Sequence, residues 1–393
     1  NFLTEMEKRG HQFWVTVKNV SSSKKLLELY GIPFIEIGDK KDSLVRKAFS
    51  QLAYNWKLLR LVHKNDIDIG MGTSITVAHV SKLTKMKSVV FDDDDDDVQP
   101  LFVYLGHPFS DHLLSPDAIR GRRRKKSCIF YPGYHELAYL HPRRFTPDPG
   151  VPAALGLAPG EPYFVLRFNA FKAHHDIGAR GLSLENKRRL VGLLKKRGRV
   201  FITAEKEIDP EFRDLQLRIP PDRAHSLLFY AAMLLGDSQT MTSEAAVLGT
   251  PALKCNTFAG RLAVPDELEQ KYGLCYSYPP SEFAALLAKL NEILALPDAK
   301  AVWRERRMRM LADKIDVTAF MAWFVEGLSP RAGIALLRAA KARALINQRD
   351  YVAPDDVQAV LPQAVAHRLV PVAGAGRGRI EQVRAMIDAV PVP

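Results

Sequence analysis

The 393-residue sequence lacks the features that define several large classes of protein. No uninterrupted apolar run approaches the roughly 18 to 20 residues of a membrane-spanning helix, so no membrane insertion is expected. The first ten residues are charged and amphipathic, which does not suit a secretory signal. Only three cysteines are present, at scattered positions without metal-ligand spacing. So sparse and odd a set favours a reducing, cytoplasmic location over a disulfide framework.

An initial methionine and an opening strand are also missing. The sequence begins at Asn1 with the helix-like segment FLTEMEKRG, which leads directly into the strand-like FWVTVK at 13–18. A doubly wound α/β domain normally opens on a strand whose following loop faces the ligand cleft. We therefore expect one strand and one functional loop of the first domain to be absent before Asn1.

Charge is concentrated in two runs of opposite sign. The net charge of +12 suggests anionic partners, and the densest basic run spans Arg122 to Lys126. This run has no interleaved aromatic residues, so it predicts a solvated loop and no nucleic-acid partner. Six aspartates occupy 92–97. Because adjacent like charges repel, Asp94 to Asp97 are expected to form an exposed loop, with a cation site as the alternative.

Residues 2 to 318 alternate between short runs rich in Val, Ile and Phe and longer segments of helical periodicity. This alternation predicts an α/β fold with parallel sheets covered on both faces. The Pro-rich segment 141–162 is typical of a linker. We expect a Rossmann-like domain at 1–145, a second at 146–326 and a helical module at 327–393. The expected strands are 13–18, 33–38, 67–72, 88–93, 163–168, 199–205, 233–238, 251–256 and 274–278.

The segment GDSQTMTSEAAVLGTPA at 236–252 combines a strand end, a tight polar turn and a short helix. Residues 240–243 open the helix, so their free amides and the helix dipole suit a phosphate. The hydroxyls of Ser238 and Thr240 add donors, and Glu244 could hold ribose hydroxyls one turn further on. The alternative is that Asp237, Ser238 and Thr240 only cap the helix. The residues alone leave both interpretations open.

Beyond these physical features, the 236–252 segment resembles the nucleotide-sugar signature of the GT-B superfamily, which includes UDP-N-acetylglucosamine 2-epimerase and many glycosyltransferases. Residues 2–326 also resemble one domain-of-unknown-function family of archaea and bacteria within it. The similarity rests on EMEKRGH, LLELYGIPF, VVFDD, YPGYHELAYLHP, the LRF…HHDIG stretch and DVTAFMAWFVE. It implies a GT-B-like fold of two Rossmann-like domains, in which the last helix, DVTAFMAWFVE, crosses back onto the first domain.

The resemblance also implies a site in the cleft between the two domains. It assigns catalytic work to His175 and Asp176, in the loop after 163–168, and to Asp92 and Asp93 at the end of VVFDD. A histidine with a pKa of about 6.5 could protonate a leaving group, as could His174 beside it; the alternative is a structural histidine satisfied by Asp176. The nucleotide-sugar is assigned to Gly236, Asp237, Ser238, Thr240, Met241, Glu244, Arg167 and Gly133. Weaker candidates near Gly133 are Tyr134, His135 and Glu136.

Two departures from the family pattern bear on activity. The Gly-His-Pro loop of the family, which would face the sugar or acceptor, is absent before Asn1. At position 239 the usual Gly is replaced by Gln. If that position needs a positive φ or a close approach of the backbone to phosphate, Gln239 strains or crowds the site.

The composition changes after residue 326. Residues 327–393 contain no Phe or Trp, a single Lys and fourteen Ala. The segment GLSPRAGIALLRAAKARALINQ predicts a helix with Ser329 as cap and Pro330 at its first position, and a second helix begins at another Pro. The module resembles the helical lid of MoxR-type AAA+ ATPases, in which Arg331 would be the sensor of the γ-phosphate. The chain has no G-x-x-x-x-G-K-[ST] motif, so it is not expected to be an ATPase on its own, and Arg331 is expected at an exposed helix start.

These features together predict a GT-B-type protein that binds a UDP-sugar and transfers or epimerises the sugar. No metal is required in this interpretation, because the helix N-terminus and basic residues can neutralise the diphosphate. Two alternatives are open: a non-catalytic binding or scaffold protein of the same fold, and a component of a MoxR-like ATPase or chaperone system. The acceptor is not specified by the sequence, and a homodimer is the assembly left open.

Overall fold

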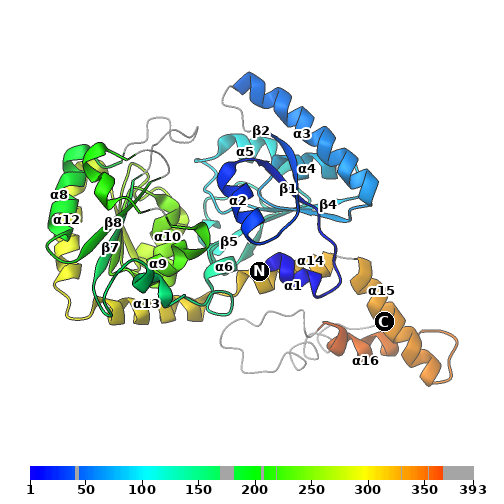
Figure 1. Ribbon diagram of the computed structural model, residues 1–393. Helices are drawn as coiled ribbons and strands as arrows, with labels where there is room; N and C mark the ends of the chain where they lie inside the picture. The colour runs from blue at the N-terminus through cyan, green and yellow to red at the C-terminus, as the bar shows by residue number, and fades with distance from the viewer. Residues whose placement is uncertain are drawn as a thin grey trace.

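The computed structural model describes residues 1–39, 44–168, 181–204, 208–217, 219–328, 330–352 and 354–365. Within these ranges every strand pairing is parallel, and helices separate most successive strands (Figure 1). Parallel strands need crossover connections, which these helices supply. The α/β class predicted from the alternating sequence pattern is confirmed.

The first half of the chain contains two sheets that are not hydrogen-bonded to each other. One has the strand order β3-β4-β5-β6, and in the other β1 pairs with β2. The strands are β1 (Val15–Asn19), β2 (Phe34–Asp39), β3 (Ile69–Met71), β4 (Lys87–Phe91), β5 (His112–Pro116) and β6 (Ile129–Tyr131). The helices are α1 (Phe2–Glu7), α2 (Ser21–Leu29), α3 (Leu44–Asn65), α4 (Ile75–Ser81), α5 (Pro100–Leu105) and α6 (Leu137–Leu140), with short 3-10 turns η1 (His107–Phe109) and η2 (Asp117–Ile119).

The second half is built on one five-stranded sheet of order β11-β10-β9-β7-β8. Figure 1 shows α8 and α12 on one face of this sheet and α9 and α10 on the other, the doubly wound arrangement. The strands are β7 (Tyr163–Phe168), β8 (Arg199–Ala204), β9 (Met233–Gly236), β10 (Ala252–Cys255) and β11 (Cys275–Tyr278). The helices are α7 (Gly150–Ala154), α8 (Leu184–Leu194), α9 (Ala224–Tyr230), α10 (Gln239–Leu248), α11 (Ala263–Gln270), α12 (Phe283–Leu294) and α13 (Ala299–Asp313), with 3-10 turns η4 (Pro210–Leu215), η5 (Pro221–Arg223) and η6 (Pro280–Glu282).

The helix α14 (Val317–Leu328) returns to the first half of the chain, where it packs against α1 and α6 (Figure 1). Arg9 of the α1 end donates to the Glu326 carboxylate at 2.7 Å. The Thr318 hydroxyl donates to the carbonyl of Ala138 at 2.6 Å. The crossing expected of the segment DVTAFMAWFVE is therefore present, and it ties the two halves together.

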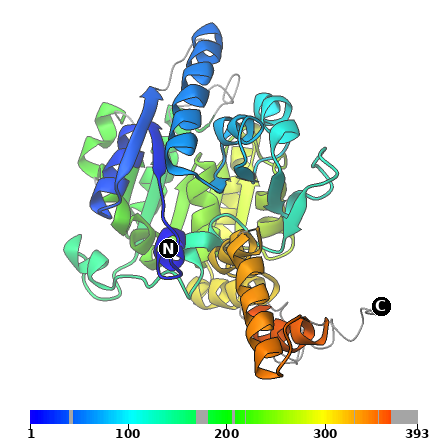
Figure 2. The ribbon, with the colours of Figure 1, turned by 90° about the vertical axis from the view of Figure 1, so that its right-hand side faces the viewer.

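A helical pair follows α14. α15 (Pro330–Ile346) and α16 (Pro354–Val365) each begin at a proline, as the sequence predicts, because proline tolerates the first helical position. The Arg349 guanidinium donates to both carboxylate oxygens of Asp356, at 2.7 and 2.8 Å. Figure 2 shows this pair projecting away from the rest of the molecule. Ser329, the Arg331 side chain and residues 366–393 lie outside the described residues.

One large hydrophobic cluster of the described residues extends through both halves. It includes Leu114 and Tyr131 from the first half, Leu166 and Leu253 from the second, and Phe320 from α14. Because one apolar cluster contains all of these elements, the two halves have a fixed relationship at their junction. All three cysteines are buried, free thiols.

Candidate functional site

A pocket lies between the two halves, where β4, β6 and β9 reach their carboxyl ends. It encloses about 590 Å³, solvent at its mouth included. Its walls come from the loops that follow β4 and β6, the first turn of α10 and the beginning of α11. The lining residues are Asp93, Asp94, Asp95, His135, Glu136, Tyr139, Gln239, Thr240, Ser243, Leu262, Val264 and Pro265.

The loop that follows β4 is held by one buried arginine. The Nη1 atom of Arg123 donates to Asp92 Oδ2 at 3.0 Å and to the Asp96 carboxylate, and Nη2 donates to the backbone carbonyls of Asp92 and Asp94, each at 3.0 Å. His107 Nε2 lies 2.7 Å from the same Asp92 oxygen. Asp92 is expected from the sequence at the cleft mouth, but its carboxylate belongs to this buried ion pair and does not line the pocket.

The two charge runs of the sequence therefore pair with each other. The prediction of an exposed acidic loop is wrong for Asp95 and Asp96, which are buried, and the prediction of a solvated basic loop is wrong for Arg123, whose side chain is 0% exposed. Buried charges persist where partners of opposite sign compensate them, and the long separation in sequence hid these partners. Two further pairs join the same runs: Arg122–Asp95 at 3.4 Å, where the aspartate is buried, and Arg124–Asp97 at 3.0 Å, which is exposed.

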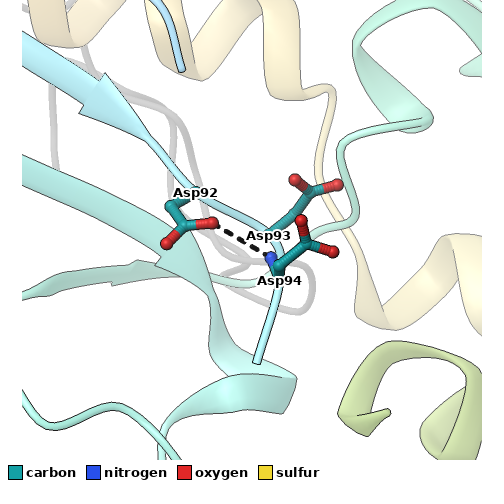
Figure 3. Close-up of side chains that lie close together, drawn as sticks. All are labelled: Asp92, Asp93 and Asp94. Carbon is teal, nitrogen blue, oxygen red and sulfur yellow. Dashed lines mark hydrogen bonds between the residues drawn. The ribbon is translucent and has the colours of Figure 1, made fainter. Parts of the chain in front are cut away.

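Asp93 and Asp94 turn toward the pocket. Figure 3 shows their carboxylates on the same side of the loop, with the Asp92 carboxylate on the other side, where its Oδ1 accepts from the Asp94 amide at 3.2 Å. One oxygen from each of the three carboxylates lies within 4.8 Å of the others. Burial, followed by the neighbouring charges of Asp93 and Asp92, raises the pKa of Asp94 to about 7.

The loop that follows β6 contributes through its later residues. At Gly133 a Cβ atom would lie 2.7 Å from Val317 of α14, so the glycine allows the close packing of α14 and does not reach the pocket. The Tyr134 hydroxyl donates to Glu267 at 2.7 Å, away from the pocket. Gly133 is therefore placed for packing rather than for contact with a ligand.

His135 and Glu136, the weaker candidates of the sequence, do line the pocket. Glu136 is 8% exposed. Burial, followed by the nearby Asp93 carboxylate, raises the pKa of Glu136 to about 8. The carboxyl groups of Asp93, Asp94 and Glu136 thus form an acidic wall of the pocket, in which burial favours the protonated forms of Asp94 and Glu136.

The turn between β9 and α10 explains the first residues of the 236–252 segment. A Cβ atom at Gly236 would lie 2.0 Å from the carbonyl oxygen of Arg167 on the neighbouring strand, so only glycine fits there. The Asp237 amide donates to that same oxygen at 3.1 Å. The Ser238 hydroxyl accepts from the Met241 amide at 3.5 Å and caps α10. Capping, the alternative left open by the sequence, is present at Ser238.

The first turn of α10 faces the pocket with Gln239, Thr240 and Ser243. Its leading amides have no acceptor within the helix, as in any first turn. Gln239 does not have a positive φ, so the backbone strain considered for this position is absent, and its crowding of a phosphate stays a prediction. Its Oε1 instead accepts from Nζ of Lys254, a fully buried side chain on β10 whose pKa burial lowers to about 8.

Glu244 is already engaged by neighbouring side chains. Its Oε1 accepts from the Tyr139 hydroxyl at 3.0 Å and lies 3.1 Å from His225 Nε2. No described residue donates to its second carboxylate oxygen. Met241 is half-buried, with its sulfur 4.0 Å from the hydroxyl of Thr203.

The other predicted residues belong to the strand β7 or to the segment that follows it. His174, His175 and Asp176 lie outside the described residues. Arg167 is half-buried on β7 beside Gly236. Of the catalytic residues predicted from the sequence, Asp93 is the one that lines the pocket in the described part of the chain.

The structure also brings in residues that the sequence interpretation missed. Arg123 and His107 anchor the acidic loop, Lys254 lies beneath α10, and Tyr139 with His225 orients Glu244. The available signal was a lysine inside the apolar strand pattern PALKCN, since a buried lysine needs a partner. The other four contacts join distant segments and leave no local pattern.

The fold is that of the GT-B glycosyltransferases and UDP-N-acetylglucosamine 2-epimerases. A glycosyltransferase of Rickettsia africae matches 81% of this chain and 89% of its own with a TM-score of 0.51 at 12% identity. The UDP-GlcNAc 2-epimerase of Methanocaldococcus jannaschii matches 78% and 94% with a TM-score of 0.54 at 14% identity. Arabidopsis thaliana UGT89C1, solved with UDP, matches 82% and 95% with a TM-score of 0.52 at 14% identity. At these identities the similarity establishes the fold alone.

The C-terminal module is similar to a different group of proteins. Residues 326–388 match the AAA lid domain family. Protein MoxR of Methylorubrum extorquens is 42% identical over 71 residues, which are 17% of this chain and 21% of that protein. The chain thus spans about a fifth of the length of this relative. The resemblance of the C-terminal segment to MoxR-type lids is confirmed, and in the described residues no helix is long and apolar enough to cross a membrane.

Proposed function

We propose that the protein binds a nucleotide-sugar, of the UDP type, in the pocket between its two halves. One observation carries the proposal: the pocket joins the carboxyl ends of β4 and β6 to the N-terminus of α10 across the junction of the two sheets. In open α/β folds ligands bind at the carboxyl ends of strands, and a helix N-terminus suits a phosphate. The similar Arabidopsis protein, solved with UDP, supports the same ligand class.

Different walls of the pocket would contact different parts of the nucleotide-sugar. Thr240 and Ser243 would contact the diphosphate with their hydroxyls and the amides of the first turn of α10. The free oxygen of Glu244 would accept from ribose, with Tyr139 and His225 fixing the carboxylate. The sugar would then face the acidic wall that contains Asp93, and the reaction would be transfer or epimerisation of that sugar. The cytoplasmic location and the roles of His175 and Asp176 remain parts of the prediction, which does not specify an acceptor.

Titration of the full chain with UDP, UDP-N-acetylglucosamine and ATP in Mg²⁺-containing buffer tests this proposal by calorimetry. Thr240→Glu adds a carboxylate where the helix dipole favours it for folding but where it repels a diphosphate. We expect the wild type to bind both uridine nucleotides and Thr240→Glu to lose at least about tenfold in affinity, or about 1.4 kcal/mol. Thr240→Ser, which keeps the hydroxyl, is the matched control.

Failure of the folded wild type to bind either uridine nucleotide contradicts the proposal and favours the scaffold alternative. Binding of ATP in their place would favour the third interpretation, a component of a MoxR-like system, for which the AAA lid match is the supporting observation. Where UDP-sugars bind, turnover assays distinguish an enzyme from a binding protein.

A further inference from the structure

The long helix α3 has an outer face that is exposed to solvent. Its inner face carries the buried side chains of Tyr54, Leu58 and Val62, and the last two pack against α4. Figure 1 shows the helix along the outer edge of the first half, with α4 on its inner side. The exposed residues of the outer face include Leu52, Trp56, Lys57, Arg60 and Lys64.

Two of these exposed residues are large and apolar. Leu52 is 66% exposed and Trp56 is 54% exposed, and because they are four residues apart their side chains are neighbours on the helix surface. The guanidinium carbon of Arg60, one turn further on, lies 3.7 Å from the centre of the Trp56 ring. Isolated exposed leucines are common on soluble proteins. A neighbouring pair that includes a tryptophan instead leaves a continuous apolar area in water.

The charges of α3 have one sign. The segment Leu44–Asn65 contains five lysines and arginines and no aspartate or glutamate, and the next acidic residue is Asp66, beyond the end of the helix. Lys57, Arg60 and Lys64 form no ion pair with a described residue. Surfaces that face only water usually intersperse both signs of charge. The outer face of α3 therefore combines an apolar area with positive charge that no described residue neutralises.

We propose that the outer face of α3 binds the surface of a membrane that contains anionic lipids. Helices that lie in a membrane interface have leucine and tryptophan on the apolar side and lysine or arginine beside them. The indole of Trp56 would enter the boundary between headgroups and acyl chains, where tryptophan is favoured, and the cations would meet the lipid phosphates. Binding would be peripheral, since in the described ranges no helix is long and apolar enough to cross a membrane.

Nucleic acid is the other polyanion that exposed cations attract. Binding to duplex DNA without sequence preference depends on phosphate contacts, so it would use the three cations and leave Leu52 and Trp56 in water. Membrane binding uses the cations and the apolar side chains together. The apolar pair therefore favours a membrane, and removal of its side chains distinguishes the two partners.

Sedimentation of the full chain with lipid vesicles tests the proposal. Vesicles of equal parts phosphatidylglycerol and phosphatidylcholine are compared with vesicles of phosphatidylcholine alone, at about 0.1 M salt, where charges more than about 10 Å apart are screened. We expect binding to the anionic vesicles, weakened at least about fivefold in Leu52→Ser and in Trp56→Ser, since both lose apolar area that the lipid would bury. Leu345→Ser is the matched control, because Leu345 is 74% exposed but lies on α15, far from α3 (Figure 1).

A second pair of variants tests the charge. Each lysine or arginine near an anionic membrane surface strengthens binding by about fivefold, so Lys57→Gln, Arg60→Gln and Lys64→Gln together should weaken it by about a hundredfold. The control makes the same change of charge at the exposed residues that follow α8, which are Lys195, Lys196 and Arg197. Circular dichroism establishes that each variant is folded.

Failure of the folded wild type to bind the anionic vesicles overturns the proposal, and so does equal binding to vesicles of phosphatidylcholine alone. An equal loss in the two triple variants also overturns it, because net charge and not α3 would then be responsible. A DNA duplex is titrated under the same conditions. Tighter binding to DNA than to vesicles, unchanged in Leu52→Ser and Trp56→Ser, overturns the assignment to a membrane.

Discussion

Replacing Arg123 by alanine should unfold the acidic loop before it affects any other part of the molecule. The Arg123 guanidinium bonds two carboxylates, those of Asp92 and Asp96, and two backbone carbonyls of the same loop. In Arg123→Ala both carboxylates remain buried without a cation. Removal of one partner from a buried ion pair typically costs about 3–5 kcal/mol, because the other charge is left uncompensated.

The expected loss can be read as a shift in melting temperature. For a unit of 150 to 250 residues each kcal/mol corresponds to roughly 2–4 °C, so Arg123→Ala should melt about 6–20 °C below the wild type. Arg124→Ala provides the control, since its pair with Asp97 is 54% and 83% exposed. Exposed pairs contribute about 0–1 kcal/mol, so this neighbour should melt within a few degrees of the wild type.

Differential scanning calorimetry of the wild type, Arg123→Ala and Arg124→Ala at one pH tests this prediction. If Arg123→Ala and Arg124→Ala melt alike, the buried network does not stabilise the loop as argued.

Two more changes test the support beneath α10. Burial lowers the pKa of Lys254 from 10.5 to about 8, so between these pH values the unfolded chain keeps a proton that the folded chain has released, and the stability of the wild type should rise by up to about 3 kcal/mol as pH rises through this range. Denaturant titrations should show that this rise is missing in Lys254→Met. Equal pH profiles of stability for the two proteins would contradict the assignment. Gly236→Ala places a Cβ 2.0 Å from the Arg167 carbonyl at a φ of 157°, and overpacking and backbone strain of about 1–3 kcal/mol each predict that stability falls by at least about 3 kcal/mol. Gly192→Ala is the control and should change stability little or raise it slightly, because a Cβ there meets nothing within 4 Å. Nearly equal denaturation midpoints for the two variants would show that β7 and β9 do not approach each other as closely as described.

The fold was predictable from the sequence because its signals are local. Each expected strand that ends in a buried apolar run, such as VVF before Asp92 or YFVLRF at 163–168, is a strand in the structure. β5 was missed, since HLLSP is short, begins with a histidine and ends with a proline, although it is buried at the centre of its sheet. The crossing of α14 followed from the resemblance and not from periodicity.

The site was less predictable because its chemistry depends on which charges meet. The acidic and basic runs, taken separately, each favour solvent. They lie about 27 residues apart and meet because the neighbouring strands β4 and β5 bring the loops that follow them to one sheet edge, so that Arg123 enters the acidic loop. Asp92, Asp95 and Asp96 form ion pairs with arginines of the basic run, whereas Asp93 and Asp94 turn toward the pocket. Which aspartates are free to act on a ligand is thus decided by the arginine, and no inspection of the acidic run alone could separate them.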